Sequence, residues 1–321
     1  MMKKLFLSIL LLVYSVFAFI QATFAWISLS TQNTLDGMEM SVTMESGMEI
    51  SLDGENFYQQ ISEDMLRKEI GHIIKLDSIT SVDGISFQKN YIGDEIFAVG
   101  NKDYITFDLW FRTSIPTTKY LYVVENINST LNYDLVQEKS FDGTYVVSKG
   151  VEWVNQSDFN NGDEVILAGT RKTYYAAEAM RMSFVEKRVE ASLLGQDDER
   201  TDFVTKIYDP SENETRGFGK EYGAYSYYLA RQVEGSLQLP TVYPNTIYHL
   251  TTFKNPYEAF SNTSQIATFQ KGETIDGVGY LYAKVKVNIW LEGWDADCID
   301  AIFEDSVIMQ LKFRGARLAS E

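Results

Sequence analysis

Strict alternation of apolar and polar residues, broken by tight turns, constrains this chain more than any other feature of its sequence. The clearest stretch alternates between two sets, Leu281, Ala283, Val285, Val287, Ile289, Leu291 and Tyr282, Lys284, Lys286, Asn288, Trp290. Residues 105–111 and 307–313 repeat the pattern. A period of two is typical of a strand with one buried face, whereas strands of parallel sheets are continuously apolar. The pattern predicts a mainly β fold, an antiparallel sandwich rather than a doubly wound one.

Five Asp-Gly dipeptides mark predicted turns, at Asp36, Asp53, Asp83, Asp142 and Asp276. Asp-Gly suits turns with positive φ, which commonly join antiparallel strands. We therefore predict one hairpin from residues 38–44 and 48–52, and a second from residues 131–137 and 145–148. No internal repeat is evident in the sequence.

One short helix is predicted directly after Ser62. Ser62 can accept a backbone hydrogen bond at the helix start, and two acidic residues follow it near the positive end of the helix dipole. The apolar stripe of this helix would be Leu66, Ile70 and Ile73 or Ile74. Residues 195–262 are more irregular, and we interpret them as a long loop-rich insertion within a single sandwich domain that covers residues 26–321.

Residues 1–25 have the pattern of a signal peptide. Lys3 and Lys4 precede an apolar stretch at residues 5–20, and Thr23 and Ala25 are small enough for cleavage after Ala25. The alternative is an uncleaved anchor, because residues 5–29 are long enough to span a bilayer. Both interpretations place the protein outside the cytoplasmic membrane, secreted or at the cell surface.

Charge and cysteine content restrict the partners. The formal net charge is -17, and loss of Lys3 and Lys4 with the signal peptide makes it -17 - 2 = -19. Such a surface repels nucleic acid and anionic lipid, so we expect no nucleic-acid partner and membrane contact only through an uncleaved signal segment. The single cysteine, Cys298, has no partner for an internal disulfide, and we expect it to be a small buried residue.

No catalytic constellation is recognisable, and we expect no catalytic residue and no enzyme activity. The chain has two histidines, His72 and His249, and lacks a His-Glu-x-x-His or Gly-x-Ser-x-Gly motif. We expect no cofactor other than calcium. Clustered hard oxygen ligands suit this ion, and the candidate ligands are Glu292, Asp295, Asp297 and Asp300. The alternative is structural: Glu292 or Asp297 could accept backbone amide hydrogen bonds and cap the turn at residues 299–304.

A loop rich in tyrosine supplies a second candidate site. Tyr225, Tyr227 and Tyr228 lie near Glu221 in the sequence, and aromatic residues beside carboxylates are typical of a sugar cleft. The alternative is that these tyrosines pack within the loops.

Two segments carry a resemblance to a known group of proteins. Ala22-Thr23-Phe24-Ala25-Trp26, followed by a predicted hairpin, resembles the start of Gram-positive exported proteins of the TasA and camelysin type. Residues 287–298, which contain Trp-Leu-Glu-Gly-Trp-Asp-Ala-Asp-Cys, and residues 179–184 are similar to segments of secreted proteins of the same bacteria. The resemblance implies a jelly-roll-like sandwich that forms fibres by donating its N-terminal strand, here residues 26–35, to a neighbour. The metalloprotease activity described for camelysin-type members is not carried over, because this chain lacks a histidine-based metal site.

Three functional hypotheses follow. The first is a secreted structural or surface protein, a fibre subunit of the biofilm matrix that associates with itself. The second is a surface adhesin or glycan-binding module, with calcium bridging protein and ligand, and the third is a hydrolase. A fibre subunit predicts concentration-dependent assembly that needs residues 26–35, whereas a glycan-binding module predicts saturable binding of a cell-surface glycan by a monomer.

Overall fold

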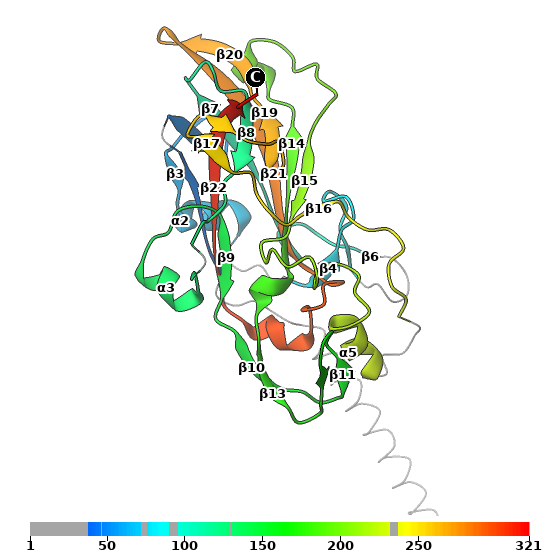
Figure 1. Cartoon of the computed structure of the whole chain (residues 1–321). Coiled ribbons are helices and arrows are strands. Elements are labelled where there is room, and N and C mark those ends of the chain that lie inside the picture. The colour runs from blue at the N-terminus through cyan, green and yellow to red at the C-terminus, as the bar shows by residue number, and fades with distance from the viewer. Residues whose placement is uncertain are drawn as a thin grey trace, which may run out of the picture.

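The protein is mainly β, with two sheets packed face to face in the computed structural model (Figure 1). The structure describes residues 38–45, 47–71, 76–89, 96–128, 130–231 and 237–320. The predicted signal peptide, the predicted donor segment, Asp36 and His72 lie outside these residues. The predicted β-sandwich is confirmed.

The first sheet is built around β22 (Val307–Leu318). β1 (Met38–Met44) pairs with one side of β22, in register from Met38 opposite Val307 to Met44 opposite Phe313. β9 and β8 pair with its other side. The remaining strands and their bounds are β3 (Gln60–Ile61), β8 (Tyr120–Val123), β9 (Tyr145–Ser148), β17 (Phe253–Asn255), β18 (Glu258–Ala259) and β19 (Gln265–Thr268).

The second sheet is built around β21 (Val278–Glu292), which pairs antiparallel with β14 (Met180–Lys187) and β7 (Ile105–Thr113). Burial alternates along the whole of β7, as its sequence predicts. The other strands are β2 (Met48–Ser51), β4 (Ser78–Thr80), β5 (Gln88–Lys89), β6 (Ile96–Phe97), β15 (Thr205–Tyr208), β16 (Thr246–Ile247) and β20 (Gln270–Ile275). Two short ribbons at the lower end in Figure 1 are β10 (Val151–Val154) with β13 (Arg171–Tyr174), and β11 (Phe159–Asn160) with β12 (Val165–Ile166).

The sheets are not purely antiparallel, which corrects one part of the prediction. β1 and β18 run parallel to β22, β4 runs parallel to β21, and β16 runs parallel to β15. Alternation in a sequence reports that one face of a strand is buried, but it does not report the direction of the neighbouring strand.

The two predicted hairpins are wrong. β1 and β2 follow one another in the chain but belong to different sheets, because the turn at Gly47 carries the chain across the sandwich and β2 pairs with β7. Both strands still bury their apolar faces in the same core, so the pattern cannot distinguish a crossing from a hairpin. In the second case the predicted first strand contains a helix, α3 (Tyr133–Glu138), whose N-cap Asn132 accepts a hydrogen bond from the Leu135 N–H at 3.0 Å. β9 then pairs with β22.

The main core fills the space between the sheets. Phe111 of the second sheet meets Phe313 of the first edge to face, with 5.0 Å between ring centroids. The helices are short: α2 (Glu63–Ile70), α3, α4 (Ala191–Leu194), α5 (Ala224–Ala230) and the 3₁₀ helices η1 (Ala176–Ala179) and η2 (Asp300–Glu304). The predicted helix is α2, in which Ser62 Oγ accepts from the Met65 N–H at 3.4 Å and Leu66 is buried. The other three α-helices were not predicted. Among the described residues, no helix has both the length and the apolar character that crossing a membrane requires.

An internal repeat covers the outer face of the second sheet, although none was expected. The Asp53 loop, residues 51–57, and the Asp83 loop, residues 81–87, share the sequence Ser-x-Asp-Gly-x-x-Phe. In the first loop the Asp carboxylate accepts two backbone N–H bonds at 2.9 and 2.8 Å, and in the second at 2.8 and 2.7 Å. In both, the serine hydroxyl accepts from the glycine N–H at 2.9 Å.

These loops explain why several residues on the outer face of β21 are buried, although that face would otherwise be open to solvent. Phe57 of the Asp53 loop packs against Tyr282, and Phe87 of the Asp83 loop packs against Trp290. The backbone carbonyl of Gly84 accepts a hydrogen bond from Asn288 at 3.2 Å. Tyr282, Asn288 and Trp290 are consequently buried.

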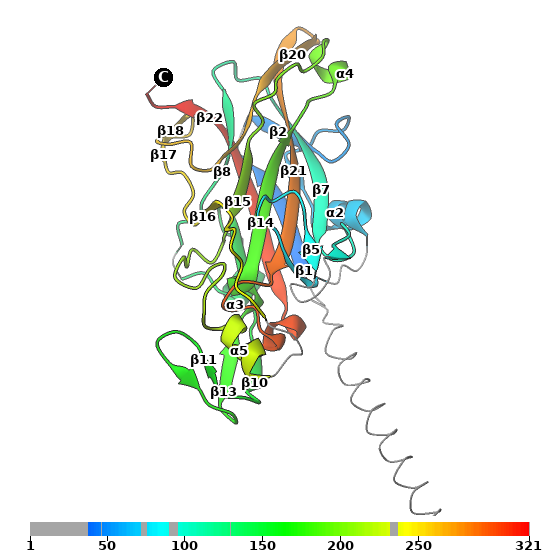
Figure 2. The same cartoon turned by 90° about the vertical axis from the view of Figure 1, so that its right-hand side faces the viewer.

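The range predicted as an insertion contributes to both sheets. Its described residues include β15 and β16, which extend the second sheet beyond β14, and β17 and β18, which extend the first sheet. α5 and irregular loops connect them. Figures 1 and 2 show β15 and β16 along the side of the sandwich, β17 near its upper end and α5 near its lower end.

Candidate functional site

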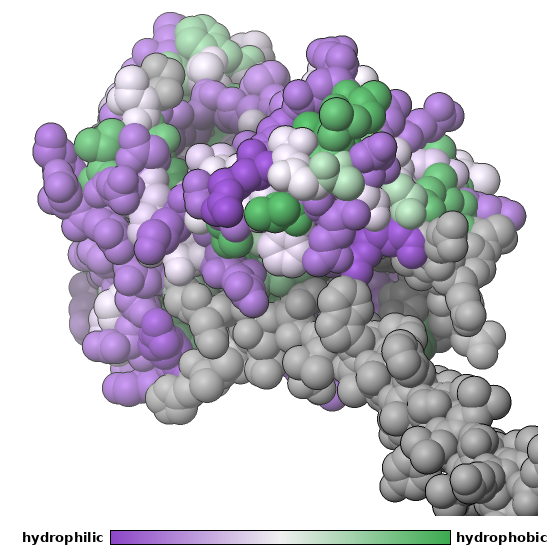
Figure 3. All heavy atoms as spheres, turned by 90° about the horizontal axis from the view of Figure 1, so that it is seen from below, coloured by the Kyte–Doolittle hydropathy of each residue, from purple (hydrophilic) through white to green (hydrophobic). Residues whose placement is uncertain are grey.

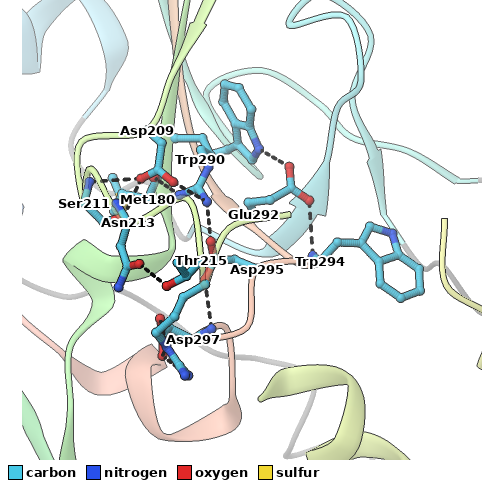
Figure 4. Close-up of polar contacts among 12 residues, drawn as sticks. Met180, Asp209, Ser211, Asn213, Thr215, Trp290, Glu292, Trp294, Asp295 and Asp297 are labelled. Carbon is cyan, nitrogen blue, oxygen red and sulfur yellow. Dashed lines mark hydrogen bonds and ion pairs between the residues drawn. The ribbon is translucent and has the colours of Figure 1, made fainter. Parts of the chain in front are cut away.

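The four carboxylates predicted as calcium ligands lie in the acidic segment, residues 292–300, which connects the end of β21 to the start of η2. Glu292 is the last residue of β21 and Asp300 the first of η2. Figure 4 shows the polar contacts of Glu292, Asp295 and Asp297. Each carboxylate has its own set of partners, and these sets differ in kind.

Glu292 is held by its own segment. Its buried carboxylate accepts from the indole Nε1–H of Trp290 at 2.9 Å and from the backbone N–H of Trp294 at 3.2 Å. Burial raises the pKa of Glu292, although these hydrogen bonds and Arg181 oppose the shift. The carboxylate therefore fixes the turn at the end of β21 by accepting a backbone N–H. It does not cap the 299–304 turn, as the structural alternative expected, because η2 begins without a side-chain cap.

Asp295 forms a buried ion pair with Arg181 of β14. The same guanidinium nitrogen, Nη2, lies 2.7 Å from Oδ2 of Asp209, so two carboxylates share one cation. Arg181 is only 2 % exposed, and Asp209 and Asp295 are also buried. Burial raises the pKa of Asp295 to about 8, with Arg181 opposing the shift and Asp297 and Asp209 adding to it. Burial likewise raises the pKa of Asp209.

Asp297 pairs with a different arginine. Arg216 donates from Nε to both of its carboxylate oxygens at 2.9 and 2.8 Å, and from Nη2 to Oδ1 at 2.6 Å. Arg216 also donates to the backbone carbonyl of Asn161 at 3.0 Å and to its Oδ1 at 2.9 Å. Through Arg216, Asp297 connects the acidic segment to the turn between β11 and β12.

Asp300 pairs with Arg231, which directly follows α5. It also accepts hydrogen bonds from the hydroxyls of Tyr227 at 3.1 Å and Tyr228 at 3.3 Å. Burial raises the pKa of the Tyr227 hydroxyl, and the Asp300 carboxylate raises it further. Asp300 thus attaches α5 to η2.

The four carboxylates do not come together as one set of ligands. Within the part of the chain that the structure describes, no group of three or more His, Cys, Asp and Glu side chains could hold a metal ion. The physical reason is that arginines from three separate segments already neutralise Asp295, Asp297 and Asp300. The arrangement joins β14, the 209–216 loop, the β11–β12 turn and α5 to the end of β21.

The arginines are the residues that sequence reasoning missed. Arg181 does have a signal in the sequence, because it is a cation within the largely apolar stretch of residues 180–185. A charge in such a strand needs a buried partner of opposite sign. Arg216 and Arg231 lie in irregular sequence, and no pattern there indicates their partners.

The tyrosine-rich loop does not form a sugar platform. Tyr227 is fully buried, and the hydroxyl of Tyr225 is directed at the backbone carbonyl of Leu237, 3.5 Å away. Glu221 is exposed. Nδ1 of His249 lies 3.6 Å from Oε2 of Glu212, and this contact involves none of the three tyrosines. These tyrosines pack within the loops, which is the alternative stated from the sequence.

Cys298 is buried as predicted, and its Sγ lies 3.7 Å from Oγ of Ser78. Burial raises the pKa of its thiol, so the reactive thiolate is disfavoured.

Comparison with known proteins adds no identity. No model of a known protein family matches the chain, and searches of curated proteins and of solved structures found no match either.

Proposed function

We propose that the protein is an exported structural protein of the cell surface or biofilm matrix, which assembles with copies of itself through its N-terminal segment. Export through residues 1–25 and the resemblance to Gram-positive fibre proteins are parts of this proposal. The acidic segment is consistent with a structural role, because Asp295, Asp297 and Asp300 are engaged in ion pairs with arginines.

One observation carries the proposal. β1, the first described strand, begins directly after residues 26–37 and lies near the margin of its sheet. Its partner on one side is β22 over seven residue pairs, whereas β3 on the other side pairs only with Val42 and Thr43. The segment freed by cleavage would therefore leave the molecule beside strand edges that can accept another strand.

The test compares the chain starting at Trp26 with the chain starting at Met38, by size-exclusion chromatography and negative-stain electron microscopy. We expect filaments or large oligomers only from the longer chain, in a concentration-dependent manner. Monomers from both chains would overturn the proposal.

A matched pair of substitutions distinguishes specific strand pairing from nonspecific hydrophobic association. Residues 27 and 29 are apolar and alternate with polar residues 28 and 30, whereas residues 31–34 are all polar. In an added strand one of these two sets faces the core. We expect Leu29→Asp to abolish assembly and Ser30→Asp to preserve it.

The described residues offer no observation that favours a glycan-binding module, because the candidate tyrosines are directed inward. Saturable binding of a glycan by a monomeric Trp26 chain would nevertheless support that hypothesis over ours.

A further inference from the structure

The two sheets are joined along part of one margin by a strand that belongs to both. Tyr58 forms a bridge to Ile50 of β2 in the second sheet, and three residues later Ile61 pairs with Val42 of β1 in the first. Facing sheets lie about 10 Å apart and paired strands about 4.8 Å apart, so a single strand fits between two sheet edges. Residues 58–61 are such a strand.

Beyond these residues, no described strand joins the two sheets along this margin. Residues 38–41 of β1 and residues 105–109 of β7 pair only on their inner sides, with β22 and β21, as far as the described chain extends. We call the space between these two edges the seam. Helix α2 contacts both β1 and β7, and Figure 2 shows it at the margin beside β7.

α2 is attached to the seam by few groups. Leu66 is its buried residue, and Met65 and Ile70 pack against the main core. Arg67 donates to the backbone carbonyl of Met38 at 3.5 Å, so α2 also covers an open carbonyl of the β1 edge. Unpaired edges invite pairing with other chains, and a covering helix is one way to prevent it.

We propose that α2 occupies the position of a missing strand, and that residues 26–37 of a second copy replace it in the assembled protein. This inference rests on the proposed function and names the acceptor site for it. The incoming strand would continue the line of residues 58–61 and pair with both edges of the seam. α2 must leave before the strand can enter, so the helix keeps the edges of a single molecule closed.

The length and pattern of the donor fit the seam. Pairing with residues 105–109 needs about five residues, or about 17 Å at about 3.3 Å per residue. Residues 26–37 provide this length together with a linker to their own β1. The alternation at residues 27–30 suits a strand with one face toward a core, and the polar residues 31–34 suit the linker.

The experiment uses the chain starting at Trp26 and weakens the attachment of α2. Leu66→Ala removes the buried anchor of the helix, but it does not alter the assembled state, in which α2 is released. Truncation of a buried leucine costs enough free energy that we expect assembly to accelerate by at least about tenfold in light scattering. Ser62→Ala, at the exposed N-cap, is a milder variant that keeps the core intact, and we expect an acceleration of about threefold.

The control is Leu194→Ala. Leu194 is the buried leucine of α4, which contacts β20 and lies away from the seam. It tests whether general destabilisation accelerates assembly. Equal acceleration by Leu194→Ala and Leu66→Ala would overturn the inference.

Hydrogen exchange identifies the site directly. On assembly, the amides of α2 should lose protection, while those of residues 38–41 and 105–109 should gain it. Assemblies in which α2 stays protected would overturn this inference and leave the proposed function standing. A chain starting at Trp26 that never assembles would overturn both the proposed function and this inference. A monomer in which α2 is released would overturn the inference as well, because the chain would then fill its own seam.

Discussion

Arg181 shows how a single residue in this protein connects distant segments. It lies within β14, yet its guanidinium contacts Asp209 beyond β15 and Asp295 beyond β21. All three side chains are buried. Removing one partner from such a group leaves an uncompensated buried charge. The loss of stability is then larger than the loss on replacing the whole group with apolar side chains.

We predict that, at a pH above the raised pKa of Asp295, Arg181→Met lowers the free energy of unfolding by about 3–5 kcal/mol, because the ionised Asp209 and Asp295 lose their shared cation. Chemical denaturation followed by tryptophan fluorescence measures the change. The control is Arg171→Met, whose pair with Glu152 is largely exposed and should cost less than about 1 kcal/mol. Similar losses for both variants would show that the buried group is not important for stability.

The raised pKa of Asp295 predicts a pH dependence of stability. The carboxyl has an ordinary pKa of 3.8 and a folded-state pKa of about 8. Between these values the folded state retains a proton that the unfolded state releases. This contribution is therefore complete below about pH 4, and it is lost as the pH rises toward about pH 8, by up to about 1.4 kcal/mol per pH unit.

Asp295→Asn keeps the shape of the protonated carboxyl and removes its titration, so we expect a shallower fall in unfolding free energy across this range. Asp209 and Glu292, whose pKa values are also raised, contribute in the same direction and remain. Asp163→Asn, at an exposed position, is the control and should leave the slope unchanged. An unchanged slope in Asp295→Asn would contradict the assignment.

At the scale of elements, the Asp53 and Asp83 loops act as covers for the second sheet. Gly84 adopts a φ of 71°, and its backbone lies close to β14 and β15. A Cβ at this position would lie 2.8 Å from Cβ of Ser183 and 3.0 Å from Cγ1 of Ile207. The glycine is therefore required both by its conformation and by the close approach of the loop to the sheet.

We predict that Gly84→Ala destabilises the protein by about 1–3 kcal/mol more than Gly169→Ala does. Gly169 has a similar φ of 83°, but a Cβ there would meet no atom within 4 Å. The comparison separates conformational strain, which both variants share, from the steric clash, which only the first has. Thermal unfolding followed by circular dichroism measures both, and equal losses would show that the loop can move away from the sheet.

The elements that the sequence predicts correctly are those whose local pattern has one structural meaning. The alternation in β7 and the cap at Ser62 are local, and both are confirmed. The predicted hairpin of β1 and β2 is wrong, because the apolar faces of the two strands are buried equally well whether the chain turns back or crosses the sandwich. The helix at residues 133–138 was predicted as a strand, because apolar side chains recur at every second residue in Leu131, Tyr133 and Leu135. The feature that favours the helix is its N-cap, Asn132.

The site was only partly predictable for a related reason. The sequence identifies a segment dense in carboxylates, and it offers calcium or backbone capping as their role. Glu292 and Asp295 each accept a backbone N–H, but Asp295, Asp297 and Asp300 also pair with arginines that lie 114, 81 and 69 residues away. Partners at such separations are brought together only by the tertiary fold.

At the scale of the whole molecule, the ion pairs and the surface have separate roles. The buried pairs connect the lower ribbons and α5 to the sandwich, whereas the described surface in Figure 3 is largely hydrophilic, with apolar residues in small separate groups. The formal net charge of -17, which becomes -19 under the proposed loss of Lys3 and Lys4, opposes contact between copies at long range. Under the proposed function, assembly therefore depends on backbone pairing at a defined edge rather than on general attraction.

The pairing of β1 with β22 also determines when the molecule can be completed. β22 is the centre of the first sheet and follows every other described strand in the chain. β1 emerges first from a ribosome or an export channel, yet its main partner emerges last, and closing so long a loop is slow. Half of the sandwich must remain unfolded until β22 is available. Under the proposed export, the topology itself would therefore delay folding until translocation is almost finished.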